Sequence, residues 1–537
     1  MKRILVIALM IVVGGGSAEA KKKPAPRRAR VAEIRKKSLV APPAPHSALF
    51  DSAPRGEGDN EQRLHAALDG VLAGRQLKSA INGLYVVDAR TGKVLYAHGE
   101  DRQLNPASNT KLVSTATALD ALGSDFTYDL RLLGAAPDDD GTVDGDAYLV
   151  GSADPTLSAR GLDDLAGALA GTGVKRVTGA VVIGDAARDA VAHPAVTVTI
   201  TGTTEGELPE VELSPDSAYF VVDTTAVTSE KKGKLEVTLA VGDEGVVVSV
   251  TGRVRPGQVV EASRSVPGAA AFTAHTFRAM ALRAGVDIVG GVKVAPGEPP
   301  ALTALAVHHS VPLTKLAALI NKPSNNFLAD RLIATVGGER FGGDPSIGKG
   351  VQAMADWLAR VGVSPGSYRL ENGSGLSHAI HMSARQLVQV LRAGAEKLGA
   401  DWVDSLSVGG RDGTLKYRFA ARPSAGHIRA KTGTLNGVAT LSGFVTVGGE
   451  EVCFSFLTSG FRHQRKNVIR EGQADAVDAM YRYLVARAGE AAPAAAPAGA
   501  APAPEATPGE GPEDREDGDD GEDGGGEATP EGTPGTP

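Results

Sequence analysis

Strand-like patterns lie near both ends of the part of this chain that can fold, with more than 300 residues between them. Residues 81–88 and 94–96 read as β-strands near the start, and 428–430, 439–447 and 451–458 read as β-strands near the end. A two-stranded hairpin is only marginally stable alone, so short strands need further partners. We therefore expect both ends of the chain to contribute strands to one sheet.

The residues between these strands have two different patterns. Helical patterns cover 313–336 and 352–361, and a last helix is expected over 474–487. Residues 134–300 instead contain short runs rich in Val and Thr, separated by Gly, Asp and Pro. The sequence therefore predicts an α/β (α+β) domain formed by 59–133 and 301–487, with a mostly β domain inserted at 134–300.

The first 20 residues have the features of a secretory signal. Lys2 and Arg3 precede an apolar run over 4–13, and a small-x-small cleavage site ends at Ala20. The run is about half as long as the roughly 20 residues that span a bilayer, so we expect cleavage rather than anchoring. The protein should then be exported, to a periplasm or another extracytoplasmic space, and soluble. The one cysteine, Cys453, cannot form an internal disulfide and is expected to be a buried strand residue.

Charge is concentrated outside the predicted domains. Residues 21–40 carry nine Lys or Arg and one Glu, whereas 488–537 carry thirteen Asp or Glu and one Arg. Because both ends are rich in Pro and Ala, we expect 21–58 and 488–537 to be disordered arms. The rest of the chain is slightly acidic, which argues against a nucleic-acid-binding protein. The basic arm is expected to make weak contacts with anionic surfaces of the cell envelope.

A serine and a lysine lie at the start of a predicted helix. Asn105 can cap this helix, Pro106 suits its first position and Gly123 suits its end. Ser108 should therefore lie in the first turn, with Lys111 on the same face three residues later. The helix dipole favours negative charge on the serine oxygen, so the pair is a candidate nucleophile and base.

To act as a base, Lys111 must be neutral, which requires burial or a second cation nearby. A second lysine is therefore expected close to it. The Ser-x-x-Lys pattern alone is weak, since it also occurs at Ser229 and Ser346. Two further motifs follow in chain order and strengthen it: Ser324-Asn325-Asn326, and Lys431-Thr432-Gly433 at the end of a predicted strand.

These three motifs together are the set found in penicillin-binding proteins and class A β-lactamases. The chain most resembles the D-alanyl-D-alanine carboxypeptidase/endopeptidase family among the low-molecular-mass class C penicillin-binding proteins, over about residues 60–487. Other segments that carry the resemblance are 105–111, 151–157, 372–377, 409–415 and 429–435. The resemblance implies a penicillin-binding serine transpeptidase-like fold, β-lactamase-like in its catalytic part, with a large insertion after the serine helix.

The same resemblance implies action on peptidoglycan D-Ala-D-Ala peptides and crosslinks, and acylation by β-lactams. Ser108 would attack the carbonyl, Lys111 would take its proton, and Ser324 with Lys431 would pass it to the leaving amine. Asn326 would orient the substrate amide. The backbone N–H groups of Ser108 and Thr434 would form the oxyanion hole. Substrate binding, including that of the terminal carboxylate, would fall to Lys431 and to Thr432, Gly433 and Thr434.

No metal or cofactor is expected. His378 and His381 are three residues apart, but no carboxylate or third histidine accompanies them at ligand spacing. Ser374, Asp412 and Gly413 are expected to shape loops at the rim of the cleft and to take no part in the chemistry.

Two other functions are compatible with parts of the pattern. A serine β-lactamase shares the nucleophile and the lysine, but it needs an efficient deacylating base, for which the sequence has no convincing motif. A catalytically idle wall-binding scaffold would not need all of Ser108, Lys111, Asn326 and Lys431. Taken singly, each motif is also an ordinary helix cap or turn.

Overall fold

The computed structural model describes residues 59–184, 189–242, 245–295, 300–462 and 465–488. The predicted signal at 1–20, the basic arm at 21–58 and the acidic tail from residue 489 onward lie outside the described residues. In the part of the chain that is described, no helix is both long enough and apolar enough to cross a membrane.

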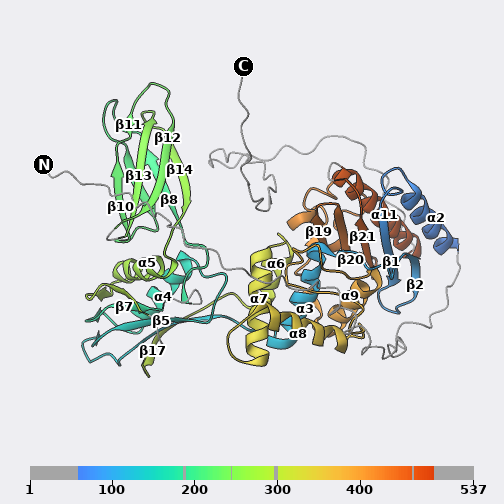
Figure 1. Ribbon diagram of the computed structural model, residues 1–537, viewed down its shortest axis with the longest axis horizontal. Coiled ribbons are helices and arrows are strands. Elements are labelled where there is room, and N and C mark those ends of the chain that lie inside the picture. Colours follow the sequence, from blue (N-terminus) through green and yellow to red (C-terminus); the bar gives the residue numbers. More distant parts are fainter. Residues whose placement is uncertain (1–58, 185–188, 243–244, 296–299, 463–464, 489–537) are drawn as a thin grey trace, which may run out of the picture. The chain divides into compact units, whose positions relative to one another are not determined.

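A six-stranded antiparallel sheet draws on both ends of the described chain (Figure 1). Strand β1 (Ile81–Asp88) pairs with β2 on one side and with β21 (Glu450–Ser459) on the other. Every residue of β1 has a partner in β21, which confirms the predicted sheet built from both ends. The strands follow the order β18-β19-β20-β21-β1-β2. The other four are β2 (Val94–His98), β18 (Ser407–Val408), β19 (Ile428–Leu435) and β20 (Val438–Val447).

Alternate residues of β1 point to opposite faces of the sheet and enter two separate cores. Tyr85 and Val87 belong to one core, and Leu84 and Val86 to the other. The first core contains α3, which is buried without interruption over residues 110–119. It also contains α6 to α9, whereas α2 and α11 pack against the opposite face. The helices are α2 (Asp59–Ala73), α3 (Thr110–Leu122), α6 (Leu313–Asn321), α7 (Asn326–Phe341), α8 (Ile347–Arg360), α9 (Ala384–Leu398), α10 (Ala400–Val403) and α11 (Lys466–Ala488).

The segment between α3 and α6 has a core of its own. The prediction that it is mostly β is confirmed, because it contains a five-stranded sheet, β16-β7-β5-β3-β17, and three smaller sheets. Two helices, α4 and α5, were not predicted; α4 contains three glycines, which weaken a helical pattern. Strands β3 and β17 pair with each other, so this sheet extends over 129–309, beyond the predicted 134–300.

The elements of this inserted segment are, in chain order, β3 (Asp129–Gly134), β4 (Thr142–Val143), β5 (Ala147–Gly151), α4 (Ala159–Gly171), β6 (Arg176–Val177), β7 (Val181–Ile183), β8 (Ala195–Thr201), β9 (Glu210–Ser214), β10 (Phe220–Thr224), β11 (Val227–Thr228), β12 (Leu235–Val241), β13 (Val246–Val254), β14 (Val259–Ser265), α5 (Ala269–Arg283), β15 (Asp287–Ile288), β16 (Val292–Val294) and β17 (Thr303–His309).

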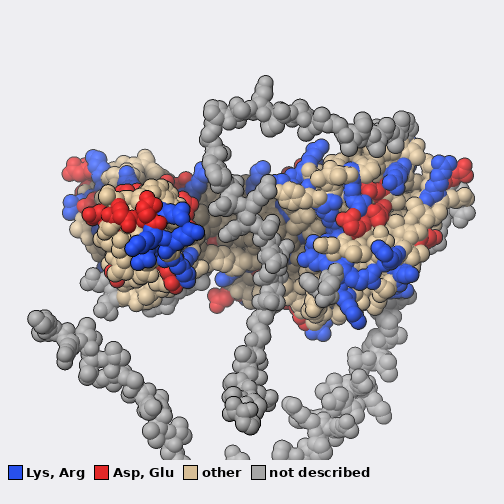
Figure 2. Space-filling model, turned by 90° about the horizontal axis from the view of Figure 1, so that it is seen from above, with Lys and Arg blue, Asp and Glu red and all other residues tan. Residues whose placement is uncertain are grey.

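Charged side chains lie mainly on the outside of the protein, and Figure 2 shows Lys and Arg intermixed with Asp and Glu on one face. Two of the described lysines depart from this pattern, because Lys111 and Lys431 are both 0% exposed. A buried ammonium group loses its hydration, so it needs polar partners or must lose its proton. The burial of these two lysines therefore lowers the stability of the fold in this region unless polar partners or loss of a proton compensate. Cys453 is also fully buried, in β21, as predicted.

Candidate active site

Ser108 lies in a 3₁₀ turn, Ala107–Asn109, directly before α3. The side-chain oxygen of Asn105 accepts a hydrogen bond from the Ala107 N–H at 2.7 Å, so the chain is tightened before the α-helix begins. The prediction that Ser108 lies in the first α-helical turn is therefore wrong, since that turn starts at Thr110. Ser108 remains half-buried, whereas the residues on both sides of it are fully buried.

The sheet fixes the position of this turn. The Thr440 hydroxyl, on β20, donates a hydrogen bond to the Pro106 carbonyl at 2.9 Å. Gly433, on β19, comes so close that a Cβ atom there would lie 2.9 Å from the Ser108 nitrogen. Because glycine has no Cβ, β19 can approach the serine turn this closely. The third motif thus lies directly beside Ser108.

The Lys111 amine lies at the centre of a small hydrogen-bond network. Its Nζ is 3.0 Å from the Ser108 Oγ, 2.6 Å from the Asn326 Oδ1 and 2.7 Å from the Ser374 carbonyl oxygen. Because Lys111 is buried, these groups take the place of water around its nitrogen. The distance between Nζ and Oγ suits direct proton transfer.

The second motif lies between two helices within the helical region predicted over 313–336. Helix α6 ends at Asn321 and α7 begins at Asn326, with Ser324 between them at φ 66°. The Asn325 side chain caps α7 by accepting a hydrogen bond from the Leu328 N–H at 2.9 Å. The break lets Asn326 start a new helix with its side chain directed at the Lys111 amine.

Lys431 lies in the middle of β19, which continues to Leu435 instead of ending before the motif as predicted. Burial, followed by the positive charge of Lys111, lowers the pKa of Lys431 well below its usual value. Its Nζ donates a hydrogen bond to the Thr432 carbonyl at 3.0 Å. The structure therefore places the expected second lysine beside the first.

Ser324 is the predicted site residue that the structure connects least closely to the others. Among the described residues, no hydrogen bond joins its hydroxyl to Ser108 or Lys431. A relay through Ser324 therefore requires a bridging water or a small rearrangement when substrate binds.

Thr432 of the third motif and Thr434, which directly follows the motif, both have polar partners. Strand β18 pairs only with Arg429 and Ala430, so it does not cover the threonines. The Thr432 hydroxyl donates to the Thr414 hydroxyl at 2.8 Å, and the Thr434 hydroxyl accepts from the Arg470 Nη2 at 2.9 Å. Arg470, on α11, was missed by the sequence analysis. It belongs to no motif and lies 36 residues from Thr434, so only tertiary packing reveals the contact.

The 409–415 loop joins the segments that carry the second and third motifs. Asp412 accepts hydrogen bonds from the Lys322 amine at 2.5 Å and from the Val408 N–H at 2.8 Å. The Thr414 N–H donates to the Lys322 carbonyl at 3.0 Å. This loop thus holds Thr414 in place beside Thr432.

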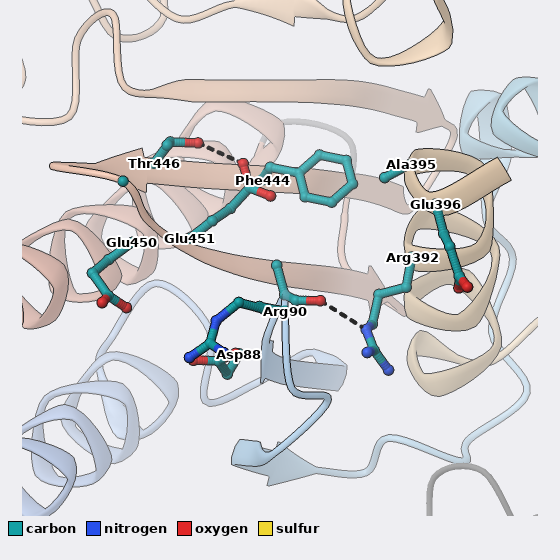
Figure 3. Close-up of a pocket in the computed structure, with 11 residues that line it drawn as sticks. Asp88, Arg90, Arg392, Ala395, Glu396, Phe444, Thr446, Glu450 and Glu451 are labelled. Atoms are coloured by element: carbon teal, nitrogen blue, oxygen red, sulfur yellow. Dashed lines mark hydrogen bonds between the residues drawn. The ribbon is translucent and has the colours of Figure 1, made fainter. Parts of the chain in front are cut away.

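A separate hollow is lined by residues of β1, β20, β21 and α9 (Figure 3). Two of its charged groups have these partners: the Arg392 Nε donates to the Ala89 carbonyl at 3.1 Å, and Glu451 accepts from the Thr446 hydroxyl at 2.6 Å. Burial raises the pKa of Glu451. None of the lining residues belongs to the three motifs, so we assign the chemistry to the site around Ser108.

This fold, with a serine paired to a buried lysine beside strand β19 of its sheet, defines the class of penicillin-binding serine peptidases. The model of the D-Ala-D-Ala carboxypeptidase 3 (S13) family matches residues 64–194 and 186–481. The chain belongs to this family and is a serine-type D-Ala-D-Ala carboxypeptidase.

Known proteins agree with this assignment. The chain is 32% identical over 468 residues to the D-alanyl-D-alanine carboxypeptidase of Actinomadura sp. (strain R39), covering 79% of this chain and 86% of the relative. It is 30% identical over 429 residues to the carboxypeptidase DacB of Mycolicibacterium smegmatis, covering 76% and 83%. Penicillin binding protein 4 (dacB) from Haemophilus influenzae superposes with a TM-score of 0.58 at 22% identity, covering 77% of this chain and 99% of that structure, which supports the fold.

We expect Lys431→Met to raise the free energy of unfolding at neutral pH, because it removes an amine that is buried beside another cation. The folded-state pKa of Lys431 is lower than its unfolded value, so the unfolded state binds more protons between the two. Native stability therefore rises with pH across this window. The gain in the Lys431→Met variant should shrink as the pH approaches about 10.4, the usual pKa of lysine.

Denaturant titrations between about pH 6 and pH 10 would measure this change. Lys397→Met is the matched control, because Lys397 is exposed on α9 and its replacement should leave the midpoint nearly unchanged. A Lys431→Met variant that is less stable than the wild type near neutral pH would contradict the expectation.

Proposed function

We propose that Ser108 cleaves the D-Ala-D-Ala bond of peptidoglycan stem peptides through an acyl-enzyme, with Lys111 as its base. The observation that carries this proposal is the buried Lys111 amine, 3.0 Å from the serine oxygen and next to a second buried lysine. Two buried amines that lie close together cannot both stay protonated without a large electrostatic cost. The pair therefore favours one neutral amine, and Lys111, whose Nζ lies 3.0 Å from the Ser108 oxygen, is the one placed to accept the serine proton.

The reaction has two stages. The Ser108 oxygen forms a bond to the carbonyl carbon as its proton passes to Lys111. The C–N bond then breaks, and the leaving D-alanine amine receives a proton through Lys431 and Ser324. Water hydrolyses the resulting ester, releases the shortened peptide and restores the serine. The same steps open a crosslink when the leaving amine belongs to a second stem peptide.

The groups around Ser108 bind the substrate. The N–H groups of Ser108 and Thr434 form the oxyanion hole, and the close approach of Gly433 to the serine turn supports this assignment. Asn326 orients the substrate amide. The terminal carboxylate binds at Lys431 and the hydroxyls of Thr432 and Thr434. Penicillins carry a carboxylate and a reactive amide in a similar arrangement, so they acylate the same serine.

We also propose that residues 1–20 direct export and are removed, so that the enzyme works outside the cytoplasm. There the basic arm, 21–58, contacts anionic polymers or membrane surfaces through its Lys and Arg side chains.

Deletion of 21–58 should weaken binding to isolated cell-wall sacculi at low salt, and this difference should disappear as salt screens the charges. Cosedimentation with and without the arm, over a range of salt concentrations, would measure it. Equal binding of the armless and full-length proteins at low salt would remove the proposed role.

Ser108→Ala should abolish covalent labelling by a fluorescent penicillin, because no other group takes over as nucleophile. The purified protein, residues 21–537, is incubated with the penicillin and denatured, and the fluorescence of its band is then measured. Ser346→Ala is the matched control: Ser346 also starts a Ser-x-x-Lys sequence, but its side chain only caps α8. It should label like the wild type.

A persistent wild-type adduct fits the peptidase, and release of D-alanine from a pentapeptide and from a crosslinked dimer can then be compared. Rapid loss of the label with bulk penicillin hydrolysis would indicate a β-lactamase. A wild-type protein that is folded but not labelled would indicate a catalytically idle wall-binding scaffold.

Arg470→Leu should lower kcat/KM for peptides with a free terminal carboxylate by about 10-fold, the value of one charge-assisted hydrogen bond. Arg470 donates to the Thr434 oxygen, which leaves the Thr434 proton available for the carboxylate. For a substrate with an amidated C-terminus, the same substitution should lower kcat/KM much less. Arg482→Leu, at an exposed position of the same helix, is the control. Equal losses on both substrates would argue against a role in carboxylate recognition.

A further inference from the structure

A loop outside the three motifs contacts the base directly. The Ser374 carbonyl accepts a hydrogen bond from the Lys111 amine at 2.7 Å, although the sequence suggested only a place at the rim of the cleft for this residue. Two successive backbone N–H groups of this loop, those of Gly373 and Ser374, are held by Asp330. Its Oδ1 accepts hydrogen bonds from the Gly373 N–H at 2.9 Å and from the Ser374 N–H at 2.8 Å.

We propose that Asp330 is a positioning residue for Lys111, which acts by fixing the backbone at 373–374. The inference rests on the proposed function, because it takes Lys111 as the base. Asp330 lies one helical turn after Asn326, so the two side chains share a face of α7. Asn326 contacts the amine directly, and Asp330 holds the loop that supplies the second acceptor. Helix α7 thus controls two of the oxygens around Lys111.

The loop is also held from its other sides. The Ser114 hydroxyl, on α3, donates to the Gly373 carbonyl at 2.6 Å. Gly375 has φ 83°, and a Cβ atom there would lie 2.0 Å from the Ala107 carbonyl oxygen. The loop is therefore packed between α3, α7 and the serine turn. A shift of the 373–374 backbone would move the Ser374 carbonyl relative to both the amine and the nucleophile.

The position of this carbonyl matters because of the geometry of a neutral amine. A neutral lysine has two N–H donors and one lone pair. When the Asn326 and Ser374 oxygens accept the two N–H groups, the lone pair is directed toward the Ser108 hydroxyl, which lies 3.0 Å away. If the Ser374 carbonyl drifts, the amine can rotate and its lone pair loses that direction. Loss of orientation lowers the rate of proton transfer without changing the contacts that bind the ligand.

A carboxylate suits this task better than a neutral group. Hydrogen bonds to an ionised acceptor are shorter and stronger than those to a neutral one. Asn at position 330 keeps an acceptor oxygen in the same place and loses only the charge, whereas Ala removes the acceptor. The two variants therefore separate acceptor position from charge.

The experiment measures acylation by a chromogenic or fluorescent penicillin in single-turnover kinetics, which separate the bond-forming rate constant from the preceding binding constant. Asp330→Ala should lower the rate constant by about 10- to 100-fold and leave the binding constant unchanged. Asp330→Asn should lower it by less than about 5-fold, since the neutral acceptor keeps its position. Glu339→Ala, at an exposed position of the same helix, should match the wild type.

Each outcome decides for or against the proposal. A rate constant for Asp330→Ala equal to that of Glu339→Ala overturns it, and so does an equal loss in the Asn and Ala variants, since charge alone would then matter. Weakened binding with an unchanged rate constant also overturns it. If Asp330→Ala does not fold, Asp330→Asn is decisive: a rate constant at least about twofold below that of Glu339→Ala supports the proposal, and an equal one rejects it. A wild type that is not acylated at Ser108 would instead reject the proposed function.

Discussion

The rest of the structure depends on holding two buried lysine amines close together. Lys111 and Lys431 are completely buried, and the charge of Lys111 helps to lower the pKa of Lys431. Desolvation and mutual repulsion both disfavour two ammonium groups, so the site favours a state with a neutral amine. The serine needs such an amine to lose its proton near neutral pH. The same burial that costs stability therefore favours the neutral amine that the proposed mechanism needs.

The two-faced sheet supplies the rigid frame for this site. Lys431 comes from β19 and Lys111 from α3, which is buried in the core against one face of the sheet. The third contributor, Asn326, begins α7 in that same core. These segments are far apart in the sequence, and the inserted domain accounts for many of the residues between α3 and α7. Because β1 pairs with β21 within one sheet, the insertion can form its own core without separating the residues of the candidate site.

The sequence predicted the parts of this design that follow from local patterns. The strands at both ends, the three motifs and the need for a second lysine were all visible in residue types and spacing. The start of α3 was misplaced because Asn105 caps Ala107 and not the α-helix, a choice that depends on local backbone geometry. Arg470 and Asp330 were missed because their partners, Thr434 and the 373–374 backbone, are brought to them only by tertiary packing.

Backbone strain shows how tightly this packing determines the site. Of the described residues other than glycine, only Ala107, Ala153 and Ser324 have positive φ, at 45°, 66° and 66°. Such a conformation costs roughly 1–2 kcal/mol for a residue with a Cβ atom. Ala107 precedes the nucleophile, and Ser324 opens the second motif, so two of the three strained positions lie at the site. Strain of this kind persists only where neighbouring contacts fix the backbone, as Asn105 does at Ala107 and as the break between α6 and α7 does at Ser324. The strained turn and the strained break set the directions from which Ser108 and Asn326 reach Lys111, and the proposed proton transfer depends on this geometry.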